Sequence, residues 1–323
     1  MEIFNYTKPI SLMGKSRRFG ILSIVVLIIS IGMILTKGFN YGIDFAGGTL
    51  IQVQYKTDAP IKKVRDAIAE DKSYEGATVT FFGSDKEIVI KTKMSSTNLG
   101  EDIGDKVRVL LQGTGDFEVR RVDMVGAKVG SELREQGLLA MLFSIIGILI
   151  YISFRFEWRF AIASVLALVH DVTIAMGMIV IFSVEVNLDI LAALLTILGY
   201  SLNDTIIVFD RIREGIRTIK DPDLSHIIDE SVTRTLSRTT LTSLTTFFVV
   251  LTLFLFGGEI IHGFSFTLLV GIIVGTYSSI FVASPILLWL GFSVKGFRQK
   301  EAEALKREKE KEKMRSMYEN GTM

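Results

Sequence analysis

The chain has 323 residues, 49% of them hydrophobic, and its 36 Lys and Arg nearly cancel its 35 Asp and Glu. A mean hydropathy of +0.43 together with 22% charged residues indicates that apolar and charged residues are segregated along the chain. The net charge of +1 gives no electrostatic reason to expect nucleic-acid binding. The chain has no cysteine and its three histidines stand far apart, so we expect no disulfide, no Cys-based metal site and no cofactor.

Six apolar runs have roughly the 17 to 25 residues that a bilayer-spanning helix needs. They lie at residues 19–36, 138–154, 160–182, 188–209, 238–256 and 264–291. No small-residue cleavage site follows the first run, so we interpret it as a retained helix and not as a signal peptide. Pro285 is expected to kink or end the last run. The predicted fold class is an α-helical polytopic membrane protein with six transmembrane helices.

The distribution of basic residues predicts the orientation. The short loops 183–187 and 257–263 contain no Lys or Arg, whereas basic residues gather before the first run, in the other loops and after the last run. The positive-inside rule then places both termini in the cytoplasm. The remaining segments are a cytoplasmic N-terminus (1–18), an outer domain (37–137), a cytoplasmic loop (210–237) and a charged cytoplasmic tail (292–323) that is either a frayed helix or disordered.

The outer domain alternates strand and helix patterns. Its strand candidates are residues 49–55, 77–82, 87–92 and 117–125, and its helix candidates are 61–71 and 98–113, with Asn98 as N-cap and Gly113 as C-cap. The order β-α-β-β-α-β predicts an α+β ferredoxin-like domain. This fold implies no function on its own.

Two acidic residues lie deep in the predicted spans. Asp171 follows Arg159 by about 18 Å of helix, which places it near the bilayer midplane beside His170. Asp204 lies in the run LGYSLNDTIIVF. A carboxylate at such depth costs about 3 kcal/mol, so each should face the bundle interior and have a partner. The alternative for both is a hydrogen-bonded aspartate with a purely structural role.

The fifth span offers a partner for Asp204. Its strictly apolar part, 241–256, is short for a bilayer, so we expect the helix to begin earlier and to carry Arg238 to a depth comparable to that of Asp204. An Asp–Arg pair in apolar surroundings makes protonation sensitive to distance, as a proton relay requires. The alternative is a static salt bridge. Gly271 and Gly275 form a GxxxG pair that we interpret as helix packing.

Four motifs resemble one known family. They are YGIDFAGGTLIQV (41–53), ALVHDV (167–172), GYSLNDTIIVFDRIRE (199–214) and RTLSRTT (234–240). Together they resemble the SecF family of protein translocase subunits, the smaller members of the SecD/SecF group in the resistance–nodulation–division (RND) superfamily. The similarity covers nearly the whole chain except the charged tail.

The resemblance implies a function and a set of site residues. A SecF-like chain would pair with SecD in the bacterial inner membrane, meet membrane lipids, act at the SecYEG channel with YajC, and use the proton-motive force or a Na⁺ gradient to promote preprotein export after the ATP-driven stage. By motif, Asp204 would be the proton carrier and Arg238 its cationic partner. Residues in possible support are Asn203, Ser201, Thr205, His170 and Asp171, and those of the structural motif are Asp44, Gly47 and Gly48.

Other functional classes remain open at the level of sequence. One is a scaffold that stabilises SecD and the channel, with a purely structural Asp–Arg pair. Another is an RND-type small-molecule exporter, although an outer domain of this size is small for enclosing a drug-sized ligand. We do not expect an enzyme, because the sequence has no nucleophile–base set, P-loop or metal-ligand cluster.

Overall fold

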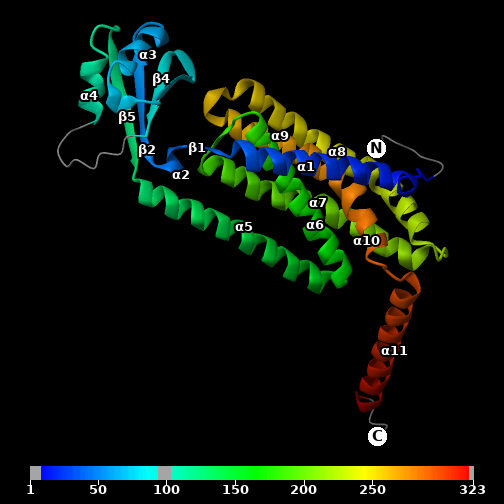
Figure 1. The fold of residues 1–323 in the computed structure, drawn as a ribbon. Helices are drawn as coiled ribbons and strands as arrows, with labels where there is room; N and C mark the ends of the chain where they lie inside the picture. The colour runs from blue at the N-terminus through cyan, green and yellow to red at the C-terminus, as the bar shows by residue number, and fades with distance from the viewer. Residues whose placement is uncertain (1–8, 94–102, 320–323) are drawn as a thin grey trace.

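A computed structural model of the chain describes residues 9–93 and 103–319. Long helices form a bundle, with a small α+β domain at one end and a single helix projecting from the other (Figure 1). Six helical segments are long and apolar enough to cross a membrane, as predicted. They are α1 (Ser16–Lys37), α5 (Ala127–Arg155), α6 (Trp158–Ile181), α7 (Leu188–Thr218), α8 (Leu224–Phe256) and α9 (Gly258–Ser278), the last continuing through η3 (Ser279–Ala283) and α10 (Ser284–Trp289).

Several helices extend beyond the apolar runs. Helix α5 already begins at Ala127, inside the segment predicted as outer domain, and α8 begins at Leu224, as the short apolar run in the fifth span indicated. Most of the predicted loop 210–237 is therefore helix. The charged tail is also helical, over α11 (Val294–Glu319). Backbone hydrogen bonds continue a helix through polar sequence, so apolar runs underestimate helix length.

Pro285 changes the hydrogen-bond pattern of the last span without ending the helix. Proline has no N–H to donate to the carbonyl four residues earlier, and the five residues of η3 just before it form a π-helical turn. The hydroxyl of Ser284 donates to the carbonyl of Ser279 at 3.1 Å across this turn. The helix then continues to Trp289.

The small domain has the predicted ferredoxin-like order. Its elements are β2 (Gly48–Tyr55), α3 (Ile61–Ala69), β3 (Thr78–Phe82), β4 (Ser84–Thr92), α4 (Ile103–Leu110) and β5 (Phe117–Val125). The four strands form an antiparallel sheet in the order β3-β4-β2-β5. The proposed N-cap Asn98 lies outside the described residues. Gly113 follows α4 with φ +95°, in the left-handed region that favours glycine.

One face of this sheet is covered by the two helices of the domain. The buried side chains alternate along β2, as the period of a strand requires, and meet one stripe of each helix. They include Ile51, Val53, Val64, Ile68, Ile103 and Val107. Burial of each such side chain contributes roughly 1.5–3 kcal/mol.

The domain is tied to the bundle at the end where α1 finishes. The strand β1 (Asn40–Tyr41) pairs in parallel with β6 (Glu185–Val186), which lies between α6 and α7. Lys91 of β4 forms an ion pair with Glu185 at 2.7 Å. The short helix α2 (Ile43–Ala46) then leads into β2. These contacts fix the sheet over the ends of α6 and α7.

Candidate functional site

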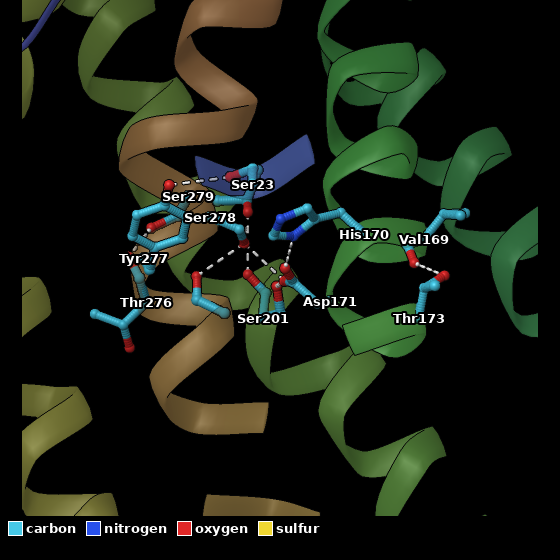
Figure 2. A network of polar contacts seen from close by, with 12 residues as sticks. Ser23, Val169, His170, Asp171, Thr173, Ser201, Thr276, Tyr277, Ser278 and Ser279 are labelled. Atoms are coloured by element: carbon cyan, nitrogen blue, oxygen red, sulfur yellow. Dashed lines mark hydrogen bonds and ion pairs between the residues drawn. The ribbon is translucent and has the colours of Figure 1, made fainter. Parts of the chain in front are cut away.

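The interior of the bundle contains a fully buried carboxylate. Asp171 of α6 has no exposed surface and receives three hydrogen bonds (Figure 2). Oδ2 accepts from the hydroxyls of Ser201 at 2.5 Å and Ser278 at 2.7 Å, and Oδ1 lies 2.8 Å from Nδ1 of His170. These contacts join α6 to α7 and to the end of α9.

Tyr277 extends this network to α1. Its hydroxyl donates to the carbonyl of Phe19 at 2.9 Å and lies 3.0 Å from Oγ of Ser23. Its ring stacks on that of His170 with centroids 6.5 Å apart. Four helices, α1, α6, α7 and α9, are thus connected through polar groups at one level of the bundle (Figure 2).

Asp204 forms a second buried carboxylate near the middle of α7. It is 1% exposed, and its Oδ2 accepts from the hydroxyl of Ser243 of α8 at 3.0 Å. Asp204 and Ser201 are three residues apart, which places them on neighbouring turns of α7. Helix α7 therefore contacts both networks: its Ser201 donates to Asp171 of α6, and its Asp204 accepts from Ser243 of α8.

The structure does not bring Arg238 to Asp204. Arg238 is exposed, and the ion pairs between described residues include none between these two side chains. Ser243 is five residues further along α8, which corresponds to about 140° around the helix and about 7.5 Å along its axis. Since Ser243 faces Asp204, Arg238 points to another side of α8. The expected Asp–Arg pair is replaced here by an Asp–Ser hydrogen bond.

The residues expected to support Asp204 divide into two groups. Ser201 and Thr205 are buried beside it, and the hydroxyl of Thr205 donates to the carbonyl of Ser201 at 3.1 Å. Asn203 is exposed and lies on a different face of α7. His170 and Asp171 belong to the neighbouring network.

Two hydroxyl donors emerge that the sequence analysis did not assign individually. Ser243 is one of many Ser and Thr at the start of the fifth span, and nothing local distinguishes it from the others. Ser278 belongs to the run TYSS (276–279) in an otherwise apolar span. This run is the sequence feature that could have predicted a polar face on the last span.

Close packing of α7 and α9 keeps these groups together. A Cβ added at Gly271 would lie 2.2 Å from Cγ1 of Ile197, and one at Gly275 would lie 2.9 Å from Cβ of Ser201. Only glycine therefore allows this approach of the two helices. The GxxxG pair packs as the sequence analysis expected.

The motif at 41–53 forms the base of the small domain. The carboxylate of Asp44 accepts from the backbone N–H of Leu188, the first residue of α7, at 3.1 Å. Gly47 has φ +76°, and a Cβ there would lie 2.6 Å from Cα of Ala127 in α5. At Gly48 a Cβ would lie 2.4 Å from the carbonyl oxygen of Thr92. The motif sets backbone geometry where the domain meets the bundle.

The chemistry available in the two buried networks is that of carboxylates, hydroxyls and the imidazole of His170. Over residues 9–93 and 103–319, no three His, Asp or Glu side chains gather in a way that could hold a metal ion. The two buried carboxylates can take up and release a proton or a small cation. The site thus combines ion-binding groups with a domain joined to the same helices.

Comparison with known proteins identifies the family. The family described as "Protein export membrane protein SecD/SecF, C-terminal" matches residues 106–293, and the "SecD/SecF GG Motif" matches residues 32–59. The chain is 49% identical over 321 residues to protein translocase subunit SecF of Helicobacter pylori, covering 99% of both chains. It is 47% identical over 292 residues to SecF of Vibrio alginolyticus, covering 90% of this chain and 92% of that one.

Solved structures share the fold. The crystal structure of SecDF, a translocon-associated membrane protein from Thermus thermophilus, superposes with a TM-score of 0.78 at 34% identity over 90% of this chain. SecDF in its super-membrane-facing form gives a TM-score of 0.67 at 32% identity over 94% of this chain. The chain spans only 40% and 41% of those two SecDF chains.

The fold and these similarities define a multi-pass membrane protein with an RND-type helical bundle and one ferredoxin-like domain. Such proteins form the SecD/SecF group of protein-export membrane proteins. Within this group, the chain belongs to the family of protein translocase subunit SecF.

Proposed function

We propose that this chain is a non-enzymatic subunit of an ion-gradient-driven export machine, in which uptake and release of a proton or Na⁺ at Asp204 promotes preprotein movement across the bacterial inner membrane. The observation that carries the proposal is the position of Asp204, buried in the middle of α7 with a neutral hydroxyl donor, Ser243. A charged carboxylate at that depth costs about 3 kcal/mol, so an arriving cation or proton is strongly favoured.

The hydrogen bond from Ser243 connects the charge of Asp204 to helix position. The ionised carboxylate only accepts hydrogen bonds, whereas the protonated acid can also donate. Proton uptake therefore changes the contact between α7 and α8. Because Asp44 holds the first residue of α7 at 3.1 Å, a shift of α7 is passed to the base of the ferredoxin-like domain.

The partners and the orientation belong to the same proposal. We propose SecD as the partner subunit, since the similar solved structures are SecDF chains of which this chain spans about 40%. SecYEG, YajC and the preprotein follow from the family resemblance. We propose both termini in the cytoplasm and the ferredoxin-like domain on the outer side, which the distribution of basic residues supports. No cofactor is needed, because the ion gradient supplies the energy.

In this proposal Arg238 can act as the cationic partner of Asp204 only if α8 moves. Arg238 is exposed and points away from the face of α8 that carries Ser243. A role as the cationic partner of Asp204 therefore requires α8 to move relative to α7 during the cycle. Substitution Arg238→Gln should then reduce gradient-driven export without changing the contact between Asp204 and Ser243.

The test is preprotein translocation into inside-out vesicles that contain SecD and this chain, at constant ATP, with the gradient present or collapsed. Asp204→Asn should abolish the gradient-dependent part while the complex still assembles. The matched control is Asp210→Asn on the same helix, an exposed residue whose carboxylate lies 3.7 Å from Arg155, and it should leave export intact. Unchanged gradient-driven export in the Asp204→Asn complex would favour the scaffold function instead.

A further inference from the structure

We propose that Asp171 and His170 form a second proton-uptake site, separate from Asp204, in which His170 passes the proton to Asp171. The inference deepens the proposed ion pathway and concerns a different carboxylate, bonded to different helices. It rests on the geometry of the buried network in Figure 2.

We take the ionised form of Asp171 as the starting state of the transfer. An ionised carboxylate has no proton to donate, so each group bonded to it in this state donates. His170, whose Nδ1 lies 2.8 Å from Oδ1 of Asp171, then carries its proton on Nδ1. In a neutral imidazole this leaves Nε2 as the basic nitrogen, and Nε2 is buried without a hydrogen-bond partner among residues 9–93 and 103–319. Nε2 lies on a side chain that is 4% exposed and can accept a proton.

Proton transfer through the ring is balanced at each step. A proton that binds Nε2 converts His170 to the imidazolium. The Nδ1 proton then moves to Oδ1 of Asp171, so one N–H bond breaks and one O–H bond forms. His170 returns to the neutral state with its proton on Nε2, and its Nδ1 now accepts from the protonated Asp171. One proton has entered, and the carboxylate has lost its charge.

The serines give this event a structural consequence. Ser278 donates to Oδ2 of Asp171 at 2.7 Å and has a second acceptor, the carbonyl of Gly275, at 3.2 Å. A neutral carboxyl group is a weaker acceptor than a carboxylate, so protonation shifts the hydroxyl of Ser278 towards Gly275. Ser278 directly precedes the π-helical turn η3, and such turns are often found at functional sites. Proton uptake at Asp171 therefore acts on the end of α9.

Hydrogen-bond donors, none of them from lysine or arginine, surround Asp171 in the described part of the chain. The titratable side chains that the network joins to it are His170 and Tyr277, and Asp204 lies three residues along α7 from Ser201. The segment of α1 between Arg18 and Lys37 carries no charged residue, and neither does η3. No lysine or arginine forms an ion pair with Asp171 among residues 9–93 and 103–319. The negative charge is held by hydrogen bonds alone.

One groove contacts both carboxylate networks. A groove of about 470 Å³ lies between α8 and the segment formed by α9 and η3, and its polar lining residues are Thr240, Ser243, Thr276 and Tyr277. Ser243 donates to Asp204, and Tyr277 stacks on His170. Each network therefore contributes one residue to the lining of this groove.

The test is infrared difference spectroscopy of the complex with SecD in lipid, as a function of pH. A protonated carboxyl group gives a C=O stretch that a carboxylate lacks. We expect a buried carboxyl band that is lost in Asp171→Asn and retained in Asp204→Asn. Ser278→Ala removes a hydrogen-bond donor to the charged form, so the band should persist to higher pH than in the parent protein. His170→Gln should slow the appearance of the band after a pH jump.

A matched control separates these effects from general loss of a hydroxyl. Ser144→Ala removes a serine that bonds only its own helix in α5, at Ala140, and should not move the band. The proposal is overturned if Asp171→Asn leaves the spectrum unchanged or if Ser278→Ala behaves like Ser144→Ala. A band assigned to Asp171 together with intact gradient-driven export in Asp204→Asn would support this inference and refute the proposed role of Asp204.

Discussion

The carboxylate of Asp44 accepts a hydrogen bond from the backbone N–H of Leu188 at 3.1 Å. Asp44 belongs to the short helix α2 at the base of the ferredoxin-like domain, and Leu188 is the first residue of α7. Asp204 lies about 24 Å further along the same helix. A continuous helix therefore connects the base of the domain to a buried carboxylate, and its first turn is held by a residue of the domain.

Removal of this contact should loosen the start of α7. We expect Asp44→Ala to lower stability by about 1 kcal/mol, the usual cost of losing a helix N-cap acceptor. The loss stays modest because Asn187 also accepts from the backbone N–H of Ile190. Hydrogen exchange in the first turn of α7 measures the effect. Asp44→Asn keeps an acceptor oxygen and should exchange more slowly than Asp44→Ala, and equal exchange in both variants would contradict the capping role.

Gly47 is required for its backbone angle and for the space that it leaves. Gly47 has φ +76° and Gly83 has φ +74°, so an alanine at either position pays a strain of about 1–2 kcal/mol. Only at Gly47 would the new Cβ meet backbone, at 2.6 Å from Cα of Ala127, since nothing lies within 4 Å at Gly83. Gly47→Ala should therefore destabilise the chain by about 1–3 kcal/mol more than Gly83→Ala. The difference is measured by thermal unfolding of the two variants in the same lipid. Equal unfolding temperatures would exclude a clash between the new Cβ at position 47 and α5.

Because Gly271 packs against Ile197, we expect a substitution at one of these positions to offset part of the destabilisation caused by a substitution at the other. Gly271→Ala places a Cβ 2.2 Å from Cγ1 of Ile197 and should cost about 1–3 kcal/mol. Ile197→Ala removes the clashing atoms and leaves a cavity of its own. The two changes should be less harmful together than the sum of their separate effects, with a coupling of about 0.5–3 kcal/mol.

A double-mutant cycle of unfolding free energies measures this coupling. The control is Gly199→Ala on α7, where a Cβ would meet nothing within 4 Å. That change should be neutral, or stabilising by up to about 1 kcal/mol, because alanine is the better helix former. Strict additivity of Gly271→Ala and Ile197→Ala would show that the helices separate instead of clashing.

The parts of the fold that could be predicted from sequence are those set by local pattern. The ferredoxin-like order followed from strand alternation and turn residues, and the six spans followed from the length of apolar runs. The burial of Asp171 and Asp204 also followed, because their positions within the runs fix their depth. Helix ends were less accurate, since the backbone of α5 and α8 remains helical through polar sequence.

The partners of the buried carboxylates could not be predicted in the same way. Which side chain faces Asp204 depends on how α8 is rotated about its axis, and hydropathy does not report that rotation. The rotation in this structure presents Ser243 and turns Arg238 away. Similarly, Ser278 of α9 donates to Asp171 of α6, a contact between residues 107 positions apart that arises only from tertiary packing.

Asp229 of α8 holds the N-terminal segment through two backbone hydrogen bonds. Its Oδ1 accepts from the backbone N–H groups of Leu12 at 2.9 Å and Met13 at 2.8 Å. Asp229→Ala leaves two buried donors without this acceptor, which should cost about 1–3 kcal/mol. Brief trypsin digestion should then cleave faster after Lys15. Asp229→Asn retains Oδ1 and should be protected like the wild type, whereas equal cleavage of all three proteins would show that other contacts hold the segment.

Arg298 joins the projecting helix α11 to the end of α7. Its guanidinium donates to three backbone carbonyls, those of Ile216 at 2.7 Å, Ile219 at 2.5 Å and Asp221 at 3.1 Å. Because the last carbonyls of a helix have no partner within it, this side chain serves as the C-terminal cap of α7. The planar fork of arginine holds several acceptors at once, which the single ammonium of lysine cannot reproduce.

Arg298→Lys keeps the positive charge but loses most of these hydrogen bonds. We therefore expect the orientation of α11 relative to α7 to become variable. The chain has no native cysteine, so spin labels at Lys220→Cys, just after the end of α7, and at Glu310→Cys on α11 report the distance between the end of α7 and α11 without background. We expect one narrow distance distribution in the parent and a broad one in Arg298→Lys, with Lys300→Ala, which removes an exposed charge from the same helix, remaining narrow. A narrow distribution in Arg298→Lys would mean that the ion pair between Arg217 and Glu301 at 2.5 Å suffices to fix α11, and the capping role of Arg298 would then be wrong.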